Sequence, residues 1–339
     1  MLSRIITYAL WLCALSVNLV RAQEENNFDD DPSFKKIFSR AYTLTPPFLD
    51  SEMGNRWFDF GGDTVVRTDR YIRLTADRPS QKGWLFSRVP LAATNFQIEF
   101  EFQIHGNGHL HGDGLAMWLT KDRATVGPVF GAQDMFEGLG IFIDTYKNGR
   151  PSTTFPYVMA MIGDGKTPYD QDKDGKANEI GGCPARGIRG TSTPVKGRLT
   201  YFQDKYLALD LLYKPDGSWS RCFRVDHEES RPIRIPSVAY LGFTAETGEL
   251  SDNHDILNVQ TYSIYQAPPS DYNPAGAAAD RKNARQFKKP NRVETNARSN
   301  NGGSWWWTLF KFFLIGAIVA GGYAAFTALR TARLGNDRW

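Results

Sequence analysis

The amino-acid sequence predicts an all-β domain, an antiparallel β-sandwich of the jelly-roll type, followed by a single C-terminal transmembrane helix. Residues 96–104 alternate apolar and polar side chains, which is the period of a half-buried strand. Clusters of glycine, proline, aspartate and asparagine separate further short apolar runs, and no long segment of residues 34–265 has the 3.6-residue period of a helix. Short strands with long polar loops are typical of a sandwich, which can reach about 200–250 residues as one domain. The further runs predict strands at 115–119, 139–143, 157–162, 206–213, 240–245 and 256–265.

Residues 1–22 have the three parts of a secretory signal peptide. Arg4 gives a basic start, residues 5–15 are apolar, and the segment ends in Ala22, a small residue at the expected cleavage site. A first transmembrane helix is the alternative, but Ser16 and Asn18 interrupt the apolar run early. We therefore expect the chain to enter the secretory pathway and to lose this segment.

The segments after the β domain predict a membrane anchor. Residues 268–304 are rich in proline, alanine, asparagine, glycine and arginine and have no heptad pattern, so we expect a flexible stalk and not a coiled coil. Residues 305–329 predict a transmembrane helix, because three tryptophans at the start suit the membrane interface and the rest is apolar apart from Lys311. The basic tail, residues 330–339, should be cytoplasmic, which makes the chain a single-pass type I membrane protein.

The composition limits the partners and the redox compartment. A net charge of +3 gives no indication of a nucleic-acid partner. Cys13 lies in the signal peptide, so Cys183 and Cys222 remain. In an oxidising lumen they either form a disulfide or stay as two buried free thiols. The chain has no Asn-x-Ser/Thr acceptor site for an N-glycan of its own.

The first candidate for chemistry is the triplet Gly112-Asp113-Gly114, directly before the strand predicted at 115–119. Glycines on both sides let the backbone approach a ligand and leave the carboxylate exposed at the strand edge. A plain turn has the same composition, so the triplet alone leaves both interpretations open.

The second candidate combines Asp144 and Asn148 with the acidic stretch 169–175. Calcium takes six to eight oxygen ligands, and Asp144 ends an apolar strand with an amide oxygen four residues later. The spacing Asp170-x-Asp172-x-Asp174 imitates an EF-hand loop, but glycine occupies the twelfth position and no helices flank it. From these residues alone, an acidic solvated loop remains the simpler alternative.

Five motifs decide between these alternatives, because together they resemble the L-type lectins of the secretory pathway, the animal relatives of the legume seed lectins. The resemblance is strongest to the short-stalked vesicular and endoplasmic-reticulum-resident members. It implies a legume-lectin-like jelly roll, and it covers residues 42–265 in the family's order. The motifs lie at residues 110–119, 127–131, 138–146, 169–175 and 247–255.

The resemblance implies one calcium ion and one sugar site beside it. The calcium ligands would be Asp144, the backbone carbonyl of Tyr146, Asn148 and Asp174. Asp113, after a cis peptide bond, would accept hydrogen bonds from mannose hydroxyls. The other residues that would contact or select the glycan are Ser80, Asn148, Gln171, Gly248, Glu249 and Leu250, and Cys183 and Cys222 would form the family's disulfide.

Two positions depart from the family pattern. Gln171 stands where the family has a sugar-binding histidine, so the ring contact and its pH sensitivity are lost while hydrogen bonding remains possible. Glu249 stands where the family commonly has aspartate, and its longer side chain changes the reach of the loop that selects the glycan arm.

The resemblance implies a calcium-dependent lectin for high-mannose N-glycans that acts as a cargo receptor or a quality-control or sorting lectin. Its location would be the endoplasmic reticulum, the ER–Golgi intermediate compartment or the Golgi, and the terminal Trp339 resembles the family's export signal, read by vesicle coat machinery. A lectin fold that lost sugar binding and serves as a scaffold is the alternative that Gln171 favours. A glycoside hydrolase is a third hypothesis, but Glu99 and Glu101 are the polar half of a simple alternation, so we expect no enzyme.

Overall fold

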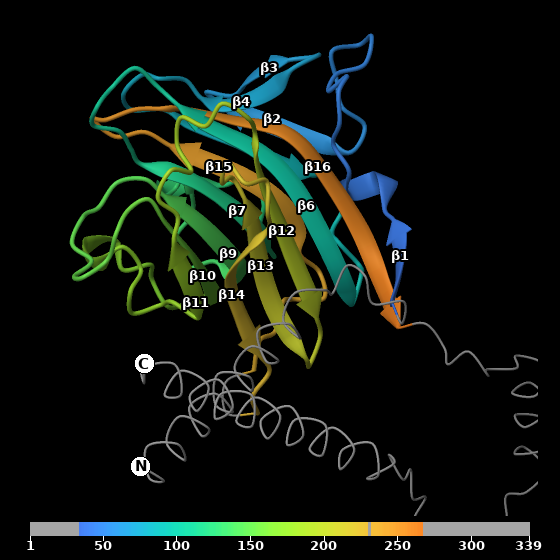
Figure 1. Ribbon diagram of the computed structural model, residues 1–339. Helices are drawn as coiled ribbons and strands as arrows, with labels where there is room; N and C mark the ends of the chain where they lie inside the picture. Colours follow the sequence, from blue (N-terminus) through green and yellow to red (C-terminus); the bar gives the residue numbers. More distant parts are fainter. Residues whose placement is uncertain (1–33, 230–231, 267–339) are drawn as a thin grey trace, which may run out of the picture. The chain divides into compact units, whose positions relative to one another are not determined.

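The computed structural model describes residues 34–229 and 232–266, which form two antiparallel sheets packed as a sandwich (Figure 1). The predicted signal peptide (1–22), stalk (268–304), transmembrane helix (305–329) and tail (330–339) lie outside the described residues. Within the described part of the chain, no helix is long and apolar enough to cross a membrane. The only helical elements there are two 3-10 turns, η1 (Arg40–Tyr42) and η2 (Gln171–Lys173).

The first sheet has eight strands in the order β14-β13-β12-β6-β16-β4-β3, and β1 pairs with the second half of β16. Every pairing is antiparallel, and neighbours are often distant in the sequence, so the chain crosses repeatedly between the sheets. The strands of this sheet are β1 (Phe34–Phe38), β3 (Val65–Arg67), β4 (Tyr71–Thr75), β6 (Asn95–His105), β12 (Val195–Phe202), β13 (Tyr206–Leu212), β14 (Ser220–Asp226) and β16 (Asn253–Gln266).

The second sheet has seven strands in the order β11-β10-β9-β7-β15-β5-β2. A short strand, β8 (Val126–Val129), forms isolated bridges with Ala132 beside this sheet. The strands of this sheet are β2 (Phe58–Gly62), β5 (Lys82–Ser87), β7 (Gly114–Thr120), β9 (Glu137–Asp144), β10 (Tyr157–Asp164), β11 (Gly181–Pro184) and β15 (Tyr240–Glu246).

The main core lies between the two sheets. The apolar positions of β6, such as Phe100 and Phe102, are at most 2% exposed and face the other sheet. Each fully buried aromatic or branched side chain stabilises the folded state by roughly 1.5–3 kcal/mol relative to an exposed one. The alternation that predicted this strand is therefore the pattern of a surface that is buried on one face only.

A second core covers the outer face of the seven-stranded sheet. Strand β7 is buried at every position, because Leu115 and Met117 point into the sandwich while Trp118 points to the other side. There the Trp118 ring packs edge-on against Phe136 and Phe142, with centroids 4.9 and 5.3 Å apart. The loops that follow β7, β9 and β10 are thus attached to the sheet by an aromatic cluster of their own.

All seven predicted strands are confirmed, as β6, β7, β9, β10, β13, β15 and β16. Most of the strands that were not predicted are short or carry glycines, and the exception is β14, where charged residues interrupt the apolar ones. Strand β12 contains Gly197, and a glycine in a sequence argues against a strand. In the fold, a Cβ at this position would lie 2.3 Å from the ring of Phe100 on the neighbouring strand. Only the partner strand explains why glycine is needed there.

The two cysteines are joined. Cys183 in β11 and Cys222 in β14 form a disulfide with their Cα atoms 5.1 Å apart. The bond links edge strands of the two sheets, so the alternative of two free thiols is wrong.

Candidate functional site

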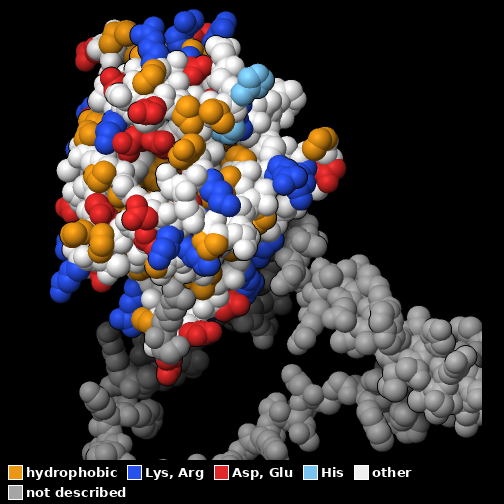
Figure 2. All heavy atoms as spheres, turned by 90° about the vertical axis from the view of Figure 1, so that its left-hand side faces the viewer, with side chains coloured by type: hydrophobic (Ala, Val, Ile, Leu, Met, Phe, Trp, Pro, Cys, Tyr) orange, Lys and Arg blue, Asp and Glu red, His pale blue; other side chains and the backbone are white. Residues whose placement is uncertain are grey.

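A cavity of about 340 Å³ lies where β7, β9 and β15 end near the loops around β8 and η2. Figure 2 shows acidic side chains spread among apolar and basic ones on the face that lies at the left in Figure 1. The cavity brings together five predicted site residues from three separate segments. Its lining residues are Asp113, Pro128, Val129, Phe130, Asp144, Tyr146, Asn148, Tyr169, Gln171, Asp172 and Glu246.

Asp113 directly precedes β7 and is held there by its backbone. The Gly112–Asp113 peptide bond is cis, as the resemblance implied. The Asp113 N–H donates to the Glu246 carbonyl at 3.1 Å, and its carbonyl accepts from the Thr145 N–H at 3.0 Å. These bonds to the ends of β15 and β9 aim the carboxylate at the cavity. Burial, and then the charge of Glu246, raises the pKa of the Asp113 carboxyl to about 6, while the Lys82 ammonium opposes the shift.

Gly248 lies next to the Asp113 carboxylate, and Ser80 is hydrogen-bonded to Gly248. The Ser80 N–H donates to the Gly248 carbonyl at 2.9 Å, which joins the two loops. A Cβ at Gly248 would be 3.2 and 3.3 Å from the two Asp113 oxygens, so this loop touches the carboxylate. Glu249 is exposed and Leu250 half-buried. Ser80 and residues 248–250 border Asp113 without lining the cavity itself.

Asp144 lines the cavity, whereas Asp174 does not; the two carboxylates are 5% and 2% exposed. One Asp144 oxygen accepts the Tyr146 N–H at 3.0 Å. Burial, and then the charge of Asp174, raises the pKa of Asp144 well above its usual range. Asp174 follows η2 with a φ of +49°, and its carboxylate accepts hydrogen bonds from the turn at 148–150.

The chemistry of these donors fits a hard divalent cation. Asp144 and Asp174 are both buried, and the charge of Asp174 adds to burial in raising the pKa of Asp144, so this pair of carboxylates calls for a compensating positive charge. In residues 34–229 and 232–266, no three His, Cys, Asp or Glu side chains are grouped for a metal, so the remaining donors must be neutral oxygens. Tyr146 and Asn148 line the same cavity as Asp144 and offer a backbone carbonyl and an amide oxygen. Carboxylate, amide and carbonyl oxygens are the set that calcium prefers.

Gln171 lines the solvent-exposed part of the cavity wall. Its side chain is exposed, and its Nε2 donates to the Pro128 carbonyl at 2.7 Å. The amide group therefore bridges η2 and β8, and one of its two N–H donors is already in use within the protein.

Comparison with known proteins identifies the fold. Residues 35–271 match the model of the legume-like lectin family. The chain belongs to this family. This lectin domain is 41% identical over 224 residues to an L-type lectin-like domain-containing protein of Schizosaccharomyces pombe, a match that covers 66% of this chain and 70% of the relative.

Animal relatives and solved structures agree with this assignment. The mouse VIP36-like protein is 38% identical over 241 residues; the match covers 68% of this chain and 65% of that protein. Among solved structures, the VIP36 exoplasmic/lumenal domain in its Ca²⁺/Man3GlcNAc-bound form superimposes with a TM-score of 0.61 and 33% identity, covering 70% of this chain and 96% of that one. The same domain in its metal-free form gives a TM-score of 0.61 and 34% identity, covering 70% and 96%.

The lectin domain also places residues at the site that sequence reasoning missed. Glu246 pairs with the Lys82 Nζ at 2.7 Å and accepts the Gly131 N–H at 3.0 Å. It directly follows a predicted strand, as Asp144 does, so its position at a strand end was an available signal. Arg150, 5% exposed, pairs with Glu179 and donates to the Asp174 carbonyl at 3.2 Å. No local pattern predicts that contact, because the partners are more than 20 residues away.

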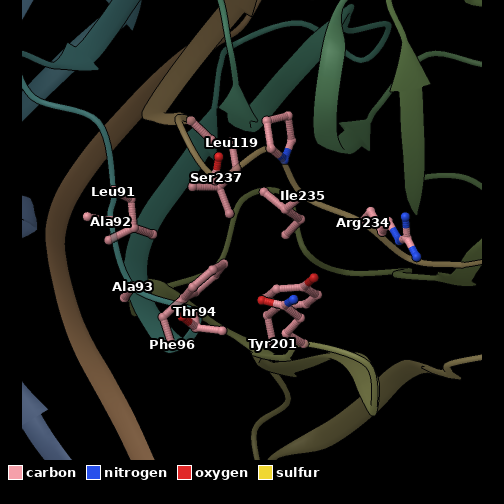
Figure 3. A pocket seen from close by; sticks show the side chains of 13 residues that line it. Leu91, Ala92, Ala93, Thr94, Phe96, Leu119, Tyr201, Arg234, Ile235 and Ser237 are labelled. Carbon is pink, nitrogen blue, oxygen red and sulfur yellow. The ribbon is translucent and has the colours of Figure 1, made fainter.

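A second cavity of about 180 Å³ lies elsewhere in the lectin domain (Figure 3). Its walls carry no aspartate or glutamate, so it lacks the donors of a calcium site. The residues that line it are Leu91, Ala92, Ala93, Thr94, Phe96, Leu119, Tyr201, Gln203, Arg234, Ile235, Pro236, Ser237 and Ala239.

Proposed function

We propose that this protein is a calcium-dependent lectin that binds high-mannose N-glycans of luminal glycoproteins and sorts them in the early secretory pathway. One observation carries the proposal: Asp113, Asp144, Asn148 and Gln171 line a single cavity although they come from three segments that are separate in the sequence. The relatives with solved structures support the ligand class, since VIP36 domains were crystallised with Ca²⁺ and mannose.

The residues have separate roles in this function. Asp144, the Tyr146 carbonyl, Asn148 and Asp174 hold the calcium ion, which supplies a positive charge that neutralises the two buried carboxylates. Asp113 accepts hydrogen bonds from sugar hydroxyls, and Asn148 contacts both ion and sugar. Ser80 and the loop at 248–250 lie on the far side of Asp113, where they select among glycan arms.

Glycan binding by the full-length chain in detergent tests this function. The chain is applied to an array of mannose oligosaccharides with calcium and again with a chelator. We expect a signal on high-mannose glycans that disappears with the chelator and with Asp113→Asn. Asp164→Asn is the matched control, because Asp164 is exposed, bonds only within its own turn and does not line the cavity. Binding that is insensitive to both chelator and Asp113→Asn contradicts the proposal.

A scaffold that has lost sugar binding is the second candidate function. The bond from Gln171 to the Pro128 carbonyl favours it, because one of the two amide N–H donors is already engaged within the protein and only the other N–H and the amide oxygen are left for a sugar. Calcium binding without any glycan signal on the same array would support the scaffold.

Hydrolysis is not the proposed activity. Legume-like lectins are carbohydrate-binding proteins, and the fold of this chain is theirs. Glu99 and Glu101, the carboxylates considered for catalysis, lie along β6 and pair with Arg198 and Lys196 on β12. They are salt-bridge partners on a sheet surface and not a pair about a scissile bond.

The cellular role follows from the predicted termini and the relatives. A signal peptide, a stalk, a transmembrane helix and a basic tail would make a type I protein of the endoplasmic reticulum, the intermediate compartment or the Golgi, with its tail offered to vesicle coats. The name of a relative, the vesicular integral-membrane protein VIP36 of the mouse, supports this placement.

A further inference from the structure

The hydroxyl of Tyr169 is a buried polar group in the wall of the calcium cavity that has no hydrogen-bond partner among the described residues. The side chain is 8% exposed. A buried hydroxyl without a partner costs roughly 1–3 kcal/mol, so native structures usually supply one.

The tyrosine ring is fixed in place, so the hydroxyl cannot turn outward to find water. The ring packs against Phe142 and Phe130, with centroids 5.0 and 6.0 Å apart. The Tyr169 N–H donates to the Asp134 carboxylate at 2.8 Å. Gly175 lies under the ring, where a Cβ would be 2.5 Å from the Tyr169 Cε2 atom. Packing on several sides therefore determines where the hydroxyl points.

The hydroxyl lies within the field of the calcium carboxylates. Burial, and then the charges of Asp144 and Asp174, raises the pKa of Tyr169, so the phenol stays protonated and keeps a proton to donate. Neither carboxylate accepts a hydrogen bond from it: Asp174 is occupied by donors from residues 148–150, and Asp144 accepts the Tyr146 N–H. The acceptor for the Tyr169 proton is therefore something that the cavity admits.

We propose that the Tyr169 hydroxyl donates a hydrogen bond to a water molecule that completes the coordination shell of the cation. The inference rests on the proposed function, because it assigns a further residue to the same calcium site. Calcium needs six to eight oxygens, and the four protein groups Asp144, Tyr146, Asn148 and Asp174 leave positions for water. A cavity of about 340 Å³ has room for it. Tyr169 is thus a positioning residue for the ion.

Tyr169→Phe in the full-length chain tests the proposal, because it removes the hydroxyl and keeps the ring that packs on Phe142 and Phe130. Tyr201→Phe is the matched control: that ring is 4% exposed, and its hydroxyl has a partner, the Ile233 carbonyl at 3.3 Å, away from the calcium cavity. The calcium Kd is measured by calorimetry without sugar, and the mannose Kd is measured at saturating calcium.

We expect Tyr169→Phe to weaken calcium binding about tenfold while the mannose affinity at saturating calcium and the melting temperature in chelator stay close to wild type. Calcium should also change the near-ultraviolet tyrosine spectrum of the wild type and of Tyr201→Phe, and change it less in Tyr169→Phe. An unchanged calcium Kd overturns the proposal. If the calcium Kd is unchanged and mannose binding is weaker, the hydroxyl contacts the sugar and not the water on the ion. A wild type that binds no calcium refutes the proposed function itself, and this proposal with it.

Discussion

Asn148 donates its backbone N–H and its side-chain amide to the same carboxylate oxygen of Asp174, both at 2.9 Å. The other Asp174 oxygen accepts the N–H groups of Gly149 and Arg150 at 3.1 and 2.9 Å. Hydrogen bonds within the protein therefore connect the turn at 148–150 with the loop that carries Asp174. The same bonds orient the Asn148 side chain, so that its amide oxygen is left for the cation.

Asn148→Ala should abolish calcium and sugar binding together. The substitution removes a proposed ligand and one of the bonds to Asp174, and we expect calcium affinity to fall on the order of 100-fold. Asn95→Ala, at an asparagine that does not line the cavity, is the control and should leave both affinities unchanged. Calorimetric titration with calcium and then with mannose measures the two losses. Sugar affinity retained without calcium binding would refute the coupling.

Gly248→Ala should weaken sugar binding and leave calcium binding intact. The new methyl group would sit 3.2 Å from an Asp113 oxygen, tighter than ordinary contact, so the carboxylate has to move by a few tenths of an ångström. A loss of roughly 1 kcal/mol, about fivefold in mannose Kd, is expected from such overpacking. Gly54→Ala is a matched control, because its methyl group would meet the Asp50 carboxylate at an ordinary 3.7 Å. Equal mannose affinities for both variants would contradict the placement of this loop.

Gln171→His should raise mannose affinity if the family's histidine contributes the contact that is missing here. The shorter imidazole side chain cannot form the hydrogen bond that the Gln171 amide donates to the Pro128 carbonyl. The substitution therefore also breaks the link between η2 and β8. Gln171→Ala separates the two effects, since it breaks the bond to Pro128 without adding a ring. We expect the affinity order His, then wild type, then Ala in a mannose titration; an alanine variant that equals the histidine variant would show that only the bridge matters.

Calcium should stabilise the folded lectin domain. In the proposed site the ion would neutralise Asp144 and Asp174, two carboxylates that are buried in the folded domain. A ligand at 100 times its Kd adds about 2.7 kcal/mol to the free energy of unfolding if it binds only the folded state. Thermal melting at several calcium concentrations measures this shift, and magnesium at the same concentrations serves as control, since its strict octahedral geometry suits the site less. A melting temperature independent of calcium would contradict the site.

Acid should destabilise the domain through His254. This side chain is fully buried with its Nδ1 atom 2.7 Å from the Thr75 hydroxyl, and burial, with smaller contributions from His105 and Arg189, lowers its pKa to about 3. In the unfolded chain the His254 side chain has a pKa near 6.5. Between pH 6.5 and pH 3 it is therefore protonated in the unfolded chain and neutral in the folded domain. Stability is therefore complete above about pH 6.5 and falls as the pH drops towards 3.

The expected loss between pH 7 and pH 5 is about 2 kcal/mol, at about 1.4 kcal/mol per pH unit. Denaturant unfolding in chelator measures it without interference from calcium release. In His254→Gln this part of the pH dependence should vanish, whereas His109→Gln, at an exposed histidine, should keep it. If the free energy of unfolding depends on pH in the same way in the wild type and in His254→Gln, His254 is not the source of the acid destabilisation.

Local patterns in the sequence predicted much of the site. Asp144 ends the apolar run 139–143 and Asp113 precedes the run 115–119, so both were recognisable as strand-end carboxylates. The structure adds that β7 and β9 are neighbours with Gly114 opposite Asp144. That register brings Asp113 to the same end of the sheet as Asp144 and the turn that follows it. Strand pairing depends on contacts between distant segments, which periodicity does not encode.

The sequence by itself determined which residues alternate, where polar loops interrupt the strands and, through its ordered motifs, the family. The tertiary structure decided the rest. It places the charges of Glu246 and Lys82 near Asp113, bonds Gln171 to Pro128, and buries the Tyr169 hydroxyl without a hydrogen-bond partner in the described part of the chain. The physical reason is that side-chain period is a local consequence of backbone geometry, whereas burial, pKa and hydrogen-bond satisfaction depend on atoms that only folding brings within a few ångströms.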